Sequence, residues 1–122
     1  MRRALVSLAL VLAACHGGED KNKARQLTGG LPERGRQAIE RYGCGACHEV
    51  PGVNGAKGLI GPPLTNIGDR MVLAGQLPNT PENMMLWIRD PQRVDSGTSM
   101  PNLNVSEGDA RDIAAYLYTL RK

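Results

Sequence analysis

Two cysteines and a histidine lie within five consecutive residues of the chain. The run Cys44-Gly45-Ala46-Cys47-His48 follows the pattern C-x-x-C-H. Two thiols one turn apart can each form a thioether with a vinyl group of a haem, and the adjacent imidazole then reaches the iron from the same side. This spacing is the attachment signature of c-type haem, so the sequence predicts one covalently bound haem c per chain.

The same cysteines are compatible with two other kinds of site. A structural zinc site needs four ligands, but the remaining cysteine and histidine, Cys15 and His16, lie in a different segment. A thiol–disulfide site of the thioredoxin kind needs a βαβ context, and no long run alternates with the period of a strand. Both alternatives are therefore less well supported than the haem site.

The composition indicates one small domain with few large side chains to form its hydrophobic core. The chain has 122 residues, 41% of them hydrophobic and 22% charged. These values exclude a disordered chain, a collagen-like repeat and a polytopic membrane protein. There is no Phe, and the large aromatic side chains are Tyr42, Trp87, Tyr116 and Tyr118. Because a small domain needs large apolar groups to bury, a haem at its centre would account for the shortage.

The first residues are typical of an export signal. Met1-Arg2-Arg3 is followed by an apolar run over residues 4–14, shorter than the roughly 20 residues that span a bilayer as a helix. The run ends in Leu12-Ala13-Ala14-Cys15, which resembles the lipobox of bacterial lipoproteins. This resemblance implies that a signal peptide, residues 1–14, is removed and that Cys15 carries a lipid. The alternatives are ordinary cleavage, which leaves a free thiol, and an uncleaved anchor.

Loss of residues 1–14 changes the charge of the chain. There are 15 Lys and Arg against 12 Asp and Glu, so without Arg2 and Arg3 the excess falls to +1. No basic stripe with interleaved aromatic residues follows, and no nucleic-acid partner is expected. Residues 15–30 are polar and Gly-rich without a helical period, which predicts a lipidated N-terminus and flexible tether with a reach of roughly 20–25 Å.

Apolar spacing and capping residues predict the helices of the domain, residues 31–122. One helix is expected over residues 33–42, where Gly35 and Ala38 would let the last helix approach closely near Tyr116. The chain then has two long Gly- and Pro-rich loops, and loops of such length are usually functional or disordered.

Capping signals mark two further helices. Thr80 as N-cap with Pro81 at the first helical position begins a helix that stops before Pro91. Ser106 and Asp109 form a capping-box pattern at the start of the last helix. A weaker helical stretch is expected over residues 69–76. The prediction is an all-α domain of three to four helices, with long loops wrapped around one covalently bound haem.

Over residues 31–122 the sequence resembles class I cytochromes c. Gly61-Pro62-Pro63-Leu64 is similar to the family's Gly-Pro-x-Leu, whose proline carbonyl accepts a hydrogen bond from Nδ1 of the proximal histidine. The resemblance thus pairs Pro62 with His48. Gly97-Thr98-Ser99-Met100-Pro101 resembles the loop that supplies the sixth ligand, which implies that Met100 binds the iron opposite His48.

Other residues compete with Met100 for that role. Met84 and Met85 lie inside an expected helix, where they would cover a face of the haem rather than bind its iron, and Met71 is a further alternative. For each of these methionines the other possibility is that it simply fills the core. His16 would bind iron only if the tether folded back. The loop around Met100 favours it over these alternatives because a loop can bring a side chain to a metal without the constraint of a helix.

The resemblance has weaker implications for three more residues. Arg70 matches a family position that pairs with a haem propionate, and Trp87 and Thr98 are candidates for the same polar edge or the adjacent pocket. The alternatives are a solvated charge for Arg70 and an ordinary core role for Trp87. Ser96 replaces a common proline, and residues 51–58 form an insertion without an assigned role.

A haem iron with His and Met axial ligands has no open position for a substrate, and Met ligation raises its reduction potential. The sequence therefore predicts a monomeric, lipid-tethered one-electron carrier between respiratory membrane complexes, on the periplasmic side of a bacterial membrane. It is not expected to be an enzyme in its own right, and its partners would be redox proteins of a respiratory chain. The alternatives are a tightly bound haem subunit of an oxidase or reductase, and a haem sensor or enzyme with a labile sixth ligand.

Overall fold

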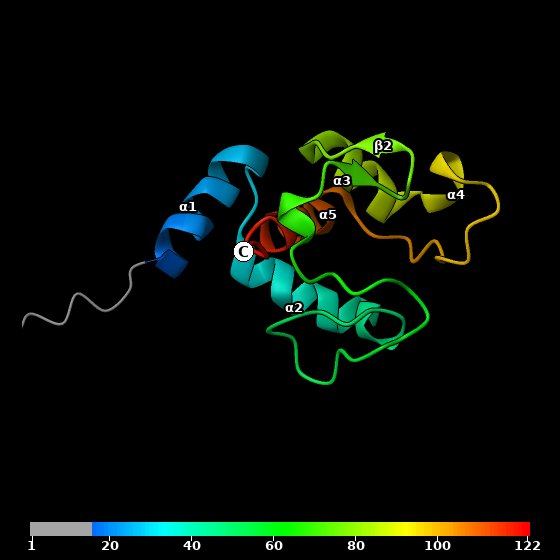
Figure 1. Cartoon of the computed structure of the whole chain (residues 1–122), viewed down its shortest axis with the longest axis horizontal. Helices are drawn as coiled ribbons and strands as arrows, with labels where there is room; N and C mark the ends of the chain where they lie inside the picture. Colours follow the sequence, from blue (N-terminus) through cyan, green and yellow to red (C-terminus); the bar gives the residue numbers. More distant parts are fainter. Residues whose placement is uncertain (1–15) are drawn as a thin grey trace, which may run out of the picture.

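The computed structural model describes residues 16–122, so the expected signal peptide and the expected lipid attachment site Cys15 lie outside the described residues. The described part is an all-α domain with one small two-stranded sheet (Figure 1). Its elements, in chain order, are α1 (His16–Thr28), α2 (Pro32–Tyr42), η1 (Cys44–Ala46), η2 (Ile67–Asp69), β1 (Val72–Leu73), β2 (Leu77–Pro78), α3 (Pro81–Arg89), α4 (Pro91–Val94) and α5 (Glu107–Leu117). Among residues 16–122, no helix has the length and apolar character needed to cross a membrane.

The centre of the fold is the packing of α2 against α5. A Cβ atom on Gly35 would come within 1.9 Å of the carbonyl oxygen of Asp112, so the two backbones lie closer than any larger residue allows. The close approach predicted at this glycine is confirmed, but it occurs at Asp112 and Ile113 rather than at Tyr116. The surrounding core is built mainly from Ala38, Ile39, Val50, Ile67, Leu73, Met84, Ile88, Ala110, Ile113, Ala114 and Leu117.

Both predicted N-caps are confirmed. The Thr80 hydroxyl accepts a hydrogen bond from the backbone N–H of Asn83 at 3.2 Å, at the start of α3. The Ser106 hydroxyl accepts one from the N–H of Asp109 at 3.1 Å, at the start of α5. The carboxylate of Asp109 accepts a hydrogen bond from the Tyr42 hydroxyl at 2.6 Å, which ties the end of α2 to the first turn of α5.

The flexible tether predicted for residues 15–30 is wrong over its described part. Residues 16–28 form the helix α1, which packs against α5. Ala24 exposes only 1% of its surface and belongs to the core cluster. Tertiary contacts, rather than a periodic apolar face, therefore stabilise this helix.

Side-chain contacts hold the middle and the C-terminal end of α1. Near the middle of the helix, Nζ of Lys21 lies 2.7 Å from Oε1 of Glu33, at the start of α2. At its C-terminus, the Thr28 hydroxyl donates to the carbonyl oxygen of Ala24 at 2.7 Å and accepts from the N–H of Gly30 at 3.0 Å. The Thr28 hydroxyl thus links the last turn of α1 to the connection that follows it.

The helical stretch predicted over residues 69–76 is also wrong. β1 and β2 pair antiparallel there, with Leu73 opposite Leu77. Ala74 and Gly75, in the connecting turn, have φ angles of 50° and 68°. An α-helix needs φ near −63°, so these two residues interrupt any helix through the segment.

Candidate functional site

The two cysteines lie at the beginning and just beyond the end of a single 3-10 turn, η1, that follows α2. Both thiols are free and partly exposed. The N–H groups of Cys47 and His48 both donate to the carbonyl oxygen of Cys44, at 3.2 and 3.0 Å, which draws the three side chains together. Burial raises the pKa of the Cys44 thiol.

The imidazole of His48 is held by the hydrogen bond that the sequence predicts. Its Nδ1 lies 2.7 Å from the carbonyl oxygen of Pro62. Because a carbonyl can only accept, Nδ1 carries the proton, and Nε2 keeps its lone pair for a metal. Gly61 lies against the ring, where a Cβ atom would come within 2.4 Å of Cε1. A side chain at residue 61 would therefore displace the imidazole.

Residues 51–58, without an assigned role in the sequence, form a cover over the cysteine turn. The N–H of Gly58 lies 3.0 Å from the carbonyl oxygen of Gly45 and 3.2 Å from that of His48. A Cβ atom on Gly45 would lie 2.7 Å from the buried Ala56. The insertion thus packs directly on the C-x-x-C-H backbone and keeps its turn closed.

Arg70, the expected partner of a haem propionate, forms hydrogen bonds with backbone carbonyl groups of a nearby loop. Its guanidinium donates to the carbonyl oxygen of Pro63 and lies 3.4 Å from that of Thr65. Arg70 therefore holds the same loop that supplies the Pro62 carbonyl to His48. The side-chain amide of Asn79 donates to the Arg70 carbonyl at 2.8 Å, which links this loop to the residues before α3.

The backbone of Met100 is bound by side chains on both sides. Its N–H donates to the Thr98 hydroxyl at 3.2 Å, and its carbonyl oxygen accepts from the Gln92 side-chain amide of α4 at 2.8 Å. Thr98 thus acts on the Met100 loop, whereas Trp87 lies half-buried on α3. Gln92 was not among the predicted site residues, because no local motif distinguishes an exposed glutamine that contacts a later loop.

The competing methionines have different environments. Met84 is buried in the core and Met85 packs against it, both on α3, as expected for methionines that fill a core. Met71 is 85% exposed, beside β1. His16, the competing histidine, begins α1, whereas the loop between α4 and α5 that carries Met100 lies at the opposite end of the molecule (Figure 1).

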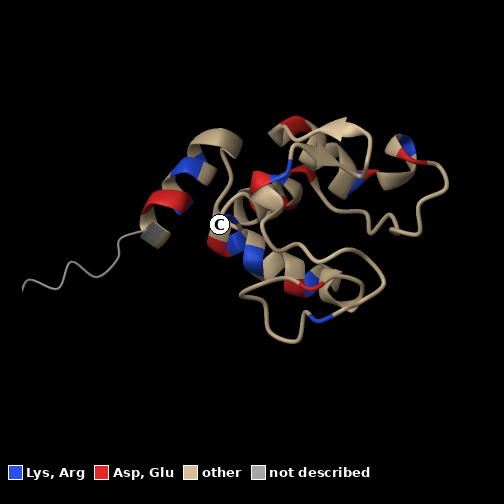
Figure 2. Cartoon of the chain, in the orientation of Figure 1, with Lys and Arg blue, Asp and Glu red and all other residues tan. Residues whose placement is uncertain are grey.

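The donor set and its surrounding loops fit a haem. The site offers two free thiols one turn apart and an imidazole with a free Nε2. Leu59 and Ile60, just before Pro62 in sequence, are 90% and 77% exposed, so the loop offers apolar side chains to a large planar group. The chain near Met100 and residues 58–66 also lacks charge, as the tan ribbon in Figure 2 shows. Over residues 16–122, no group of three or more His, Cys, Asp or Glu residues could hold a metal ion by itself.

The sequence model of the Cytochrome c family matches residues 32–121. The chain belongs to the cytochrome c family. Membership accounts for the C-x-x-C-H turn, since members carry covalently bound haem c and transfer electrons. The all-α prediction and the haem c prediction are both confirmed by this match. The matched range starts at Pro32, so α1 lies before it.

Three curated relatives share the name cytochrome c oxidase subunit 2. The protein of Alkalihalophilus pseudofirmus is 44% identical over 92 residues, which cover 75% of this chain and 26% of the relative. That of Bacillus sp. strain PS3 is 32% identical over 89 residues, 70% of this chain and 25% of the relative. That of Bacillus subtilis strain 168 is 28% identical over 102 residues, 82% of this chain and 29% of the relative. The chain spans about a quarter of the length of these relatives.

Proposed function

We propose that this cytochrome c is a one-electron carrier held on the periplasmic side of a bacterial membrane by a lipid on Cys15. In this proposal, Cys44 and Cys47 would attach the haem, and His48 and Met100 would supply the protein ligands to its iron. The bound haem supplies reversible one-electron chemistry. The observation that carries the proposal is the fixed imidazole, with Nδ1 of His48 on the Pro62 carbonyl at 2.7 Å.

The two axial residues are held in ways that suit electron transfer. The Pro62 carbonyl fixes the orientation of the His48 ring and leaves Nε2 as the nitrogen available to a metal. Thr98 and Gln92 hold the backbone of Met100. Because both ligand residues are anchored to the chain, their positions need change little between the two oxidation states.

The relatives support a place for the chain beside a terminal oxidase. Their printed name is that of an oxidase subunit, and the 89 to 102 residues that they share with this chain overlap the cytochrome c domain. We propose that the electron acceptor is such an oxidase and that the donor is another respiratory complex. The rival proposal, a permanently bound haem subunit, predicts a complex that survives purification in detergent, whereas a carrier would be released as a monomer.

The axial ligands can be tested by absorption spectra of the matured protein, oxidised and reduced, with and without carbon monoxide. We expect a near-red Met–iron band in the oxidised protein and no carbon monoxide binding in the reduced one. Met100→Ala should lose the band and bind carbon monoxide. Met71→Ala, at an exposed methionine, is the matched control and should retain the band. A wild-type protein that binds carbon monoxide readily would favour a sensor or enzyme instead.

The lipid can be tested by mass spectrometry of the protein purified from membranes. We expect a mature chain that begins at Cys15 and carries acyl groups. Cys15→Ser should move the haem protein from the membrane to the soluble periplasmic fraction. An unmodified mature N-terminus in the wild-type protein would disprove the anchor and leave the haem chemistry unaffected.

A further inference from the structure

The helix α1 is an integral part of the described domain although it lies before the family match. The match covers residues 32–121, whereas α1 covers His16–Thr28. Ala24 at its centre is 1% exposed and lies in the same core cluster as Ala110 and Ile113 of α5. The helix therefore shares the core of the domain and does not extend from it as an arm.

The connection from α1 to α2 is as closely packed as the helix itself. A Cβ atom on Gly30 would come within 2.4 Å of the carbonyl oxygen of Arg111, so the connection runs directly over the backbone of α5. The N–H of Leu31 donates to Oδ1 of Asp112 at 2.8 Å. These contacts leave little freedom for a hinge between α1 and the rest of the fold.

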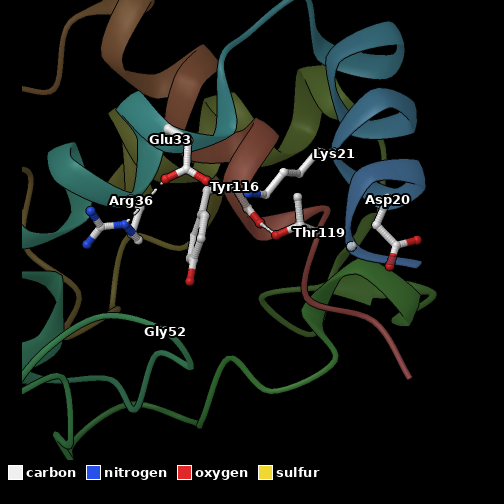
Figure 3. A pocket seen from close by; sticks show the side chains of 8 residues that line it. Asp20, Lys21, Glu33, Arg36, Gly52, Tyr116 and Thr119 are labelled. Carbon is white, nitrogen blue, oxygen red and sulfur yellow. Dashed lines mark hydrogen bonds and ion pairs between the residues drawn. The ribbon is translucent and has the colours of Figure 1, made fainter. Parts of the chain in front are cut away.

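A charged contact holds the N-terminal half of α1. Figure 3 shows Lys21 reaching from α1 to the region of Glu33 on α2, beside Tyr116 of α5. The Nζ–Oε1 distance is 2.7 Å, and this ammonium lowers the pKa of Glu33. Because both side chains are exposed, the ion pair contributes little to the free energy of unfolding. Its role is to fix the position of α1 relative to α2. Together with the buried Ala24 and the packed connection at Gly30, it attaches α1 to the domain from the middle of the helix to the turn that follows it.

We propose that α1 is a rigid base that orients the domain on the membrane, so that the Met100 loop points away from the bilayer. This inference rests on the proposed lipid at Cys15, which would be attached one residue before the first residue of α1. A helix of 13 residues is about 20 Å long, and Cys15 directly precedes its first residue in the sequence. The start of α1 and the loop between α4 and α5 lie at opposite ends of the molecule (Figure 1).

The orientation selects a kind of redox partner. With α1 at the membrane, the Met100 loop would face an extramembrane domain that holds its redox centre at a height comparable to the length of this domain. A centre buried within the bilayer would lie on the wrong side of the molecule. The partner that fits is therefore a respiratory complex with a redox centre in a domain outside the membrane.

The orientation can be measured because the haem is planar and absorbs polarised light anisotropically. The lipidated holoprotein would be bound to an aligned supported bilayer, and linear dichroism of its haem absorption recorded. We expect clear dichroism for the wild-type protein. A Gly-Ser linker of about ten residues inserted between Cys15 and His16, with a reach of roughly 16–19 Å, should abolish the dichroism and keep the haem spectrum and membrane binding.

Substitutions in α1 provide a matched pair. Ala24→Asp places a charge at a buried position, which should release α1 from α5 and remove the dichroism. Lys23→Asp places the same side chain at the exposed neighbouring position and should preserve it. Equal dichroism in the wild-type and linker proteins, or none in either, would overturn the proposal.

A second measurement separates this inference from the lipid anchor. Hydrogen exchange of the α1 amides in the soluble Cys15→Ser holoprotein reports docking of the helix without any membrane. We expect exchange slower than that of an unstructured chain by roughly tenfold or more, and loss of this protection in Ala24→Asp. Unprotected α1 amides would disprove the rigid base even if the lipid is present. Protected amides with an unmodified Cys15 in the wild-type protein would disprove the anchor instead, and with it the membrane orientation.

Discussion

The side-chain amide of Gln92 donates a hydrogen bond of 2.8 Å to the carbonyl oxygen of Met100. This contact joins α4 to the loop proposed to supply the sixth iron ligand. Ser96 stands in the same loop, at a position where the resemblance to class I cytochromes c leads us to expect a proline. A serine restricts the backbone less than a proline would. The hydrogen bond from Gln92 therefore supplies a restraint on this loop that its backbone lacks.

We expect Gln92→Ala to loosen the Met100 loop. Loss of one hydrogen bond of this kind costs about 0.5–1 kcal/mol, which raises the population with Met100 off the iron by roughly two- to fivefold. Absorption spectra should show a weaker near-red band and measurable carbon monoxide binding. Gln37→Ala, at an exposed position on α2, is the control. Identical spectra for both variants would contradict the role of Gln92.

The close contact between α2 and α5 predicts opposite effects for two glycines. Gly35→Ala would place a Cβ atom 1.9 Å from the Asp112 carbonyl oxygen, so the helices must separate. We expect a loss of about 1–3 kcal/mol in the free energy of unfolding, measured with denaturant. Gly108→Ala, in the first turn of α5 with no atom within 4 Å, should be neutral or stabilise the domain by up to about 1 kcal/mol. A neutral Gly35→Ala variant would show that the helices are not in such close contact.

The ionised carboxylate of Asp109 predicts a specific acid sensitivity. The Tyr42 hydroxyl, and to a lesser extent Ser106 and Arg41, lowers the pKa of Asp109 in the folded protein. A lowered pKa contributes stability above the unfolded value of about 4 and loses it as the pH falls through the folded value. Thermal melting of Tyr42→Phe and the wild-type protein should therefore differ most at neutral pH and converge in acid. A difference that is the same at pH 7 and well below pH 4 would refute this coupling.

Asn79 binds three groups with one side chain. Its amide nitrogen donates to the carbonyl oxygens of Ile67 and Arg70 at 3.0 and 2.8 Å, and its Oδ1 accepts from Tyr118 at 2.7 Å. We expect Asn79→Ala to cost about 2–3 kcal/mol in the free energy of unfolding, since its three partners, two of them buried residues, lose their hydrogen bonds together. Asn54→Ala, at an exposed loop position, should change it by less than about 0.5 kcal/mol.

The elements that the sequence predicts correctly are those with local signals. Thr80 and Ser106 mark the starts of α3 and α5 because a cap acts on residues only a few positions away. The pairing of His48 with Pro62 was also predictable, since the family motif places both residues. Local motifs suffice for these features because their determinants lie within one segment.

The features that escaped prediction depend on distant contacts. α1 has no periodic apolar face and is stabilised through Ala24, Lys21 and its connection to α5. The hairpin depends on Ala74 at a positive φ angle, a conformation that alanine seldom adopts. Local preference therefore favoured a helix there, and the tertiary structure overrode it.

The three tyrosines each direct their hydroxyl to one acceptor in another segment. Tyr118 binds Asn79, Tyr116 binds the Pro51 carbonyl at 2.5 Å, and the acceptor of Tyr42 is Asp109. The chain has no Phe, so each of its phenyl rings belongs to a tyrosine whose hydroxyl is hydrogen-bonded. A phenylalanine would fill the same space, but it has no hydroxyl group whose hydrogen bond would fix the position of the ring. The few aromatic rings of this chain therefore have a fixed orientation as well as a fixed place. Each one favours a single arrangement of the loops over others that would fill the same volume.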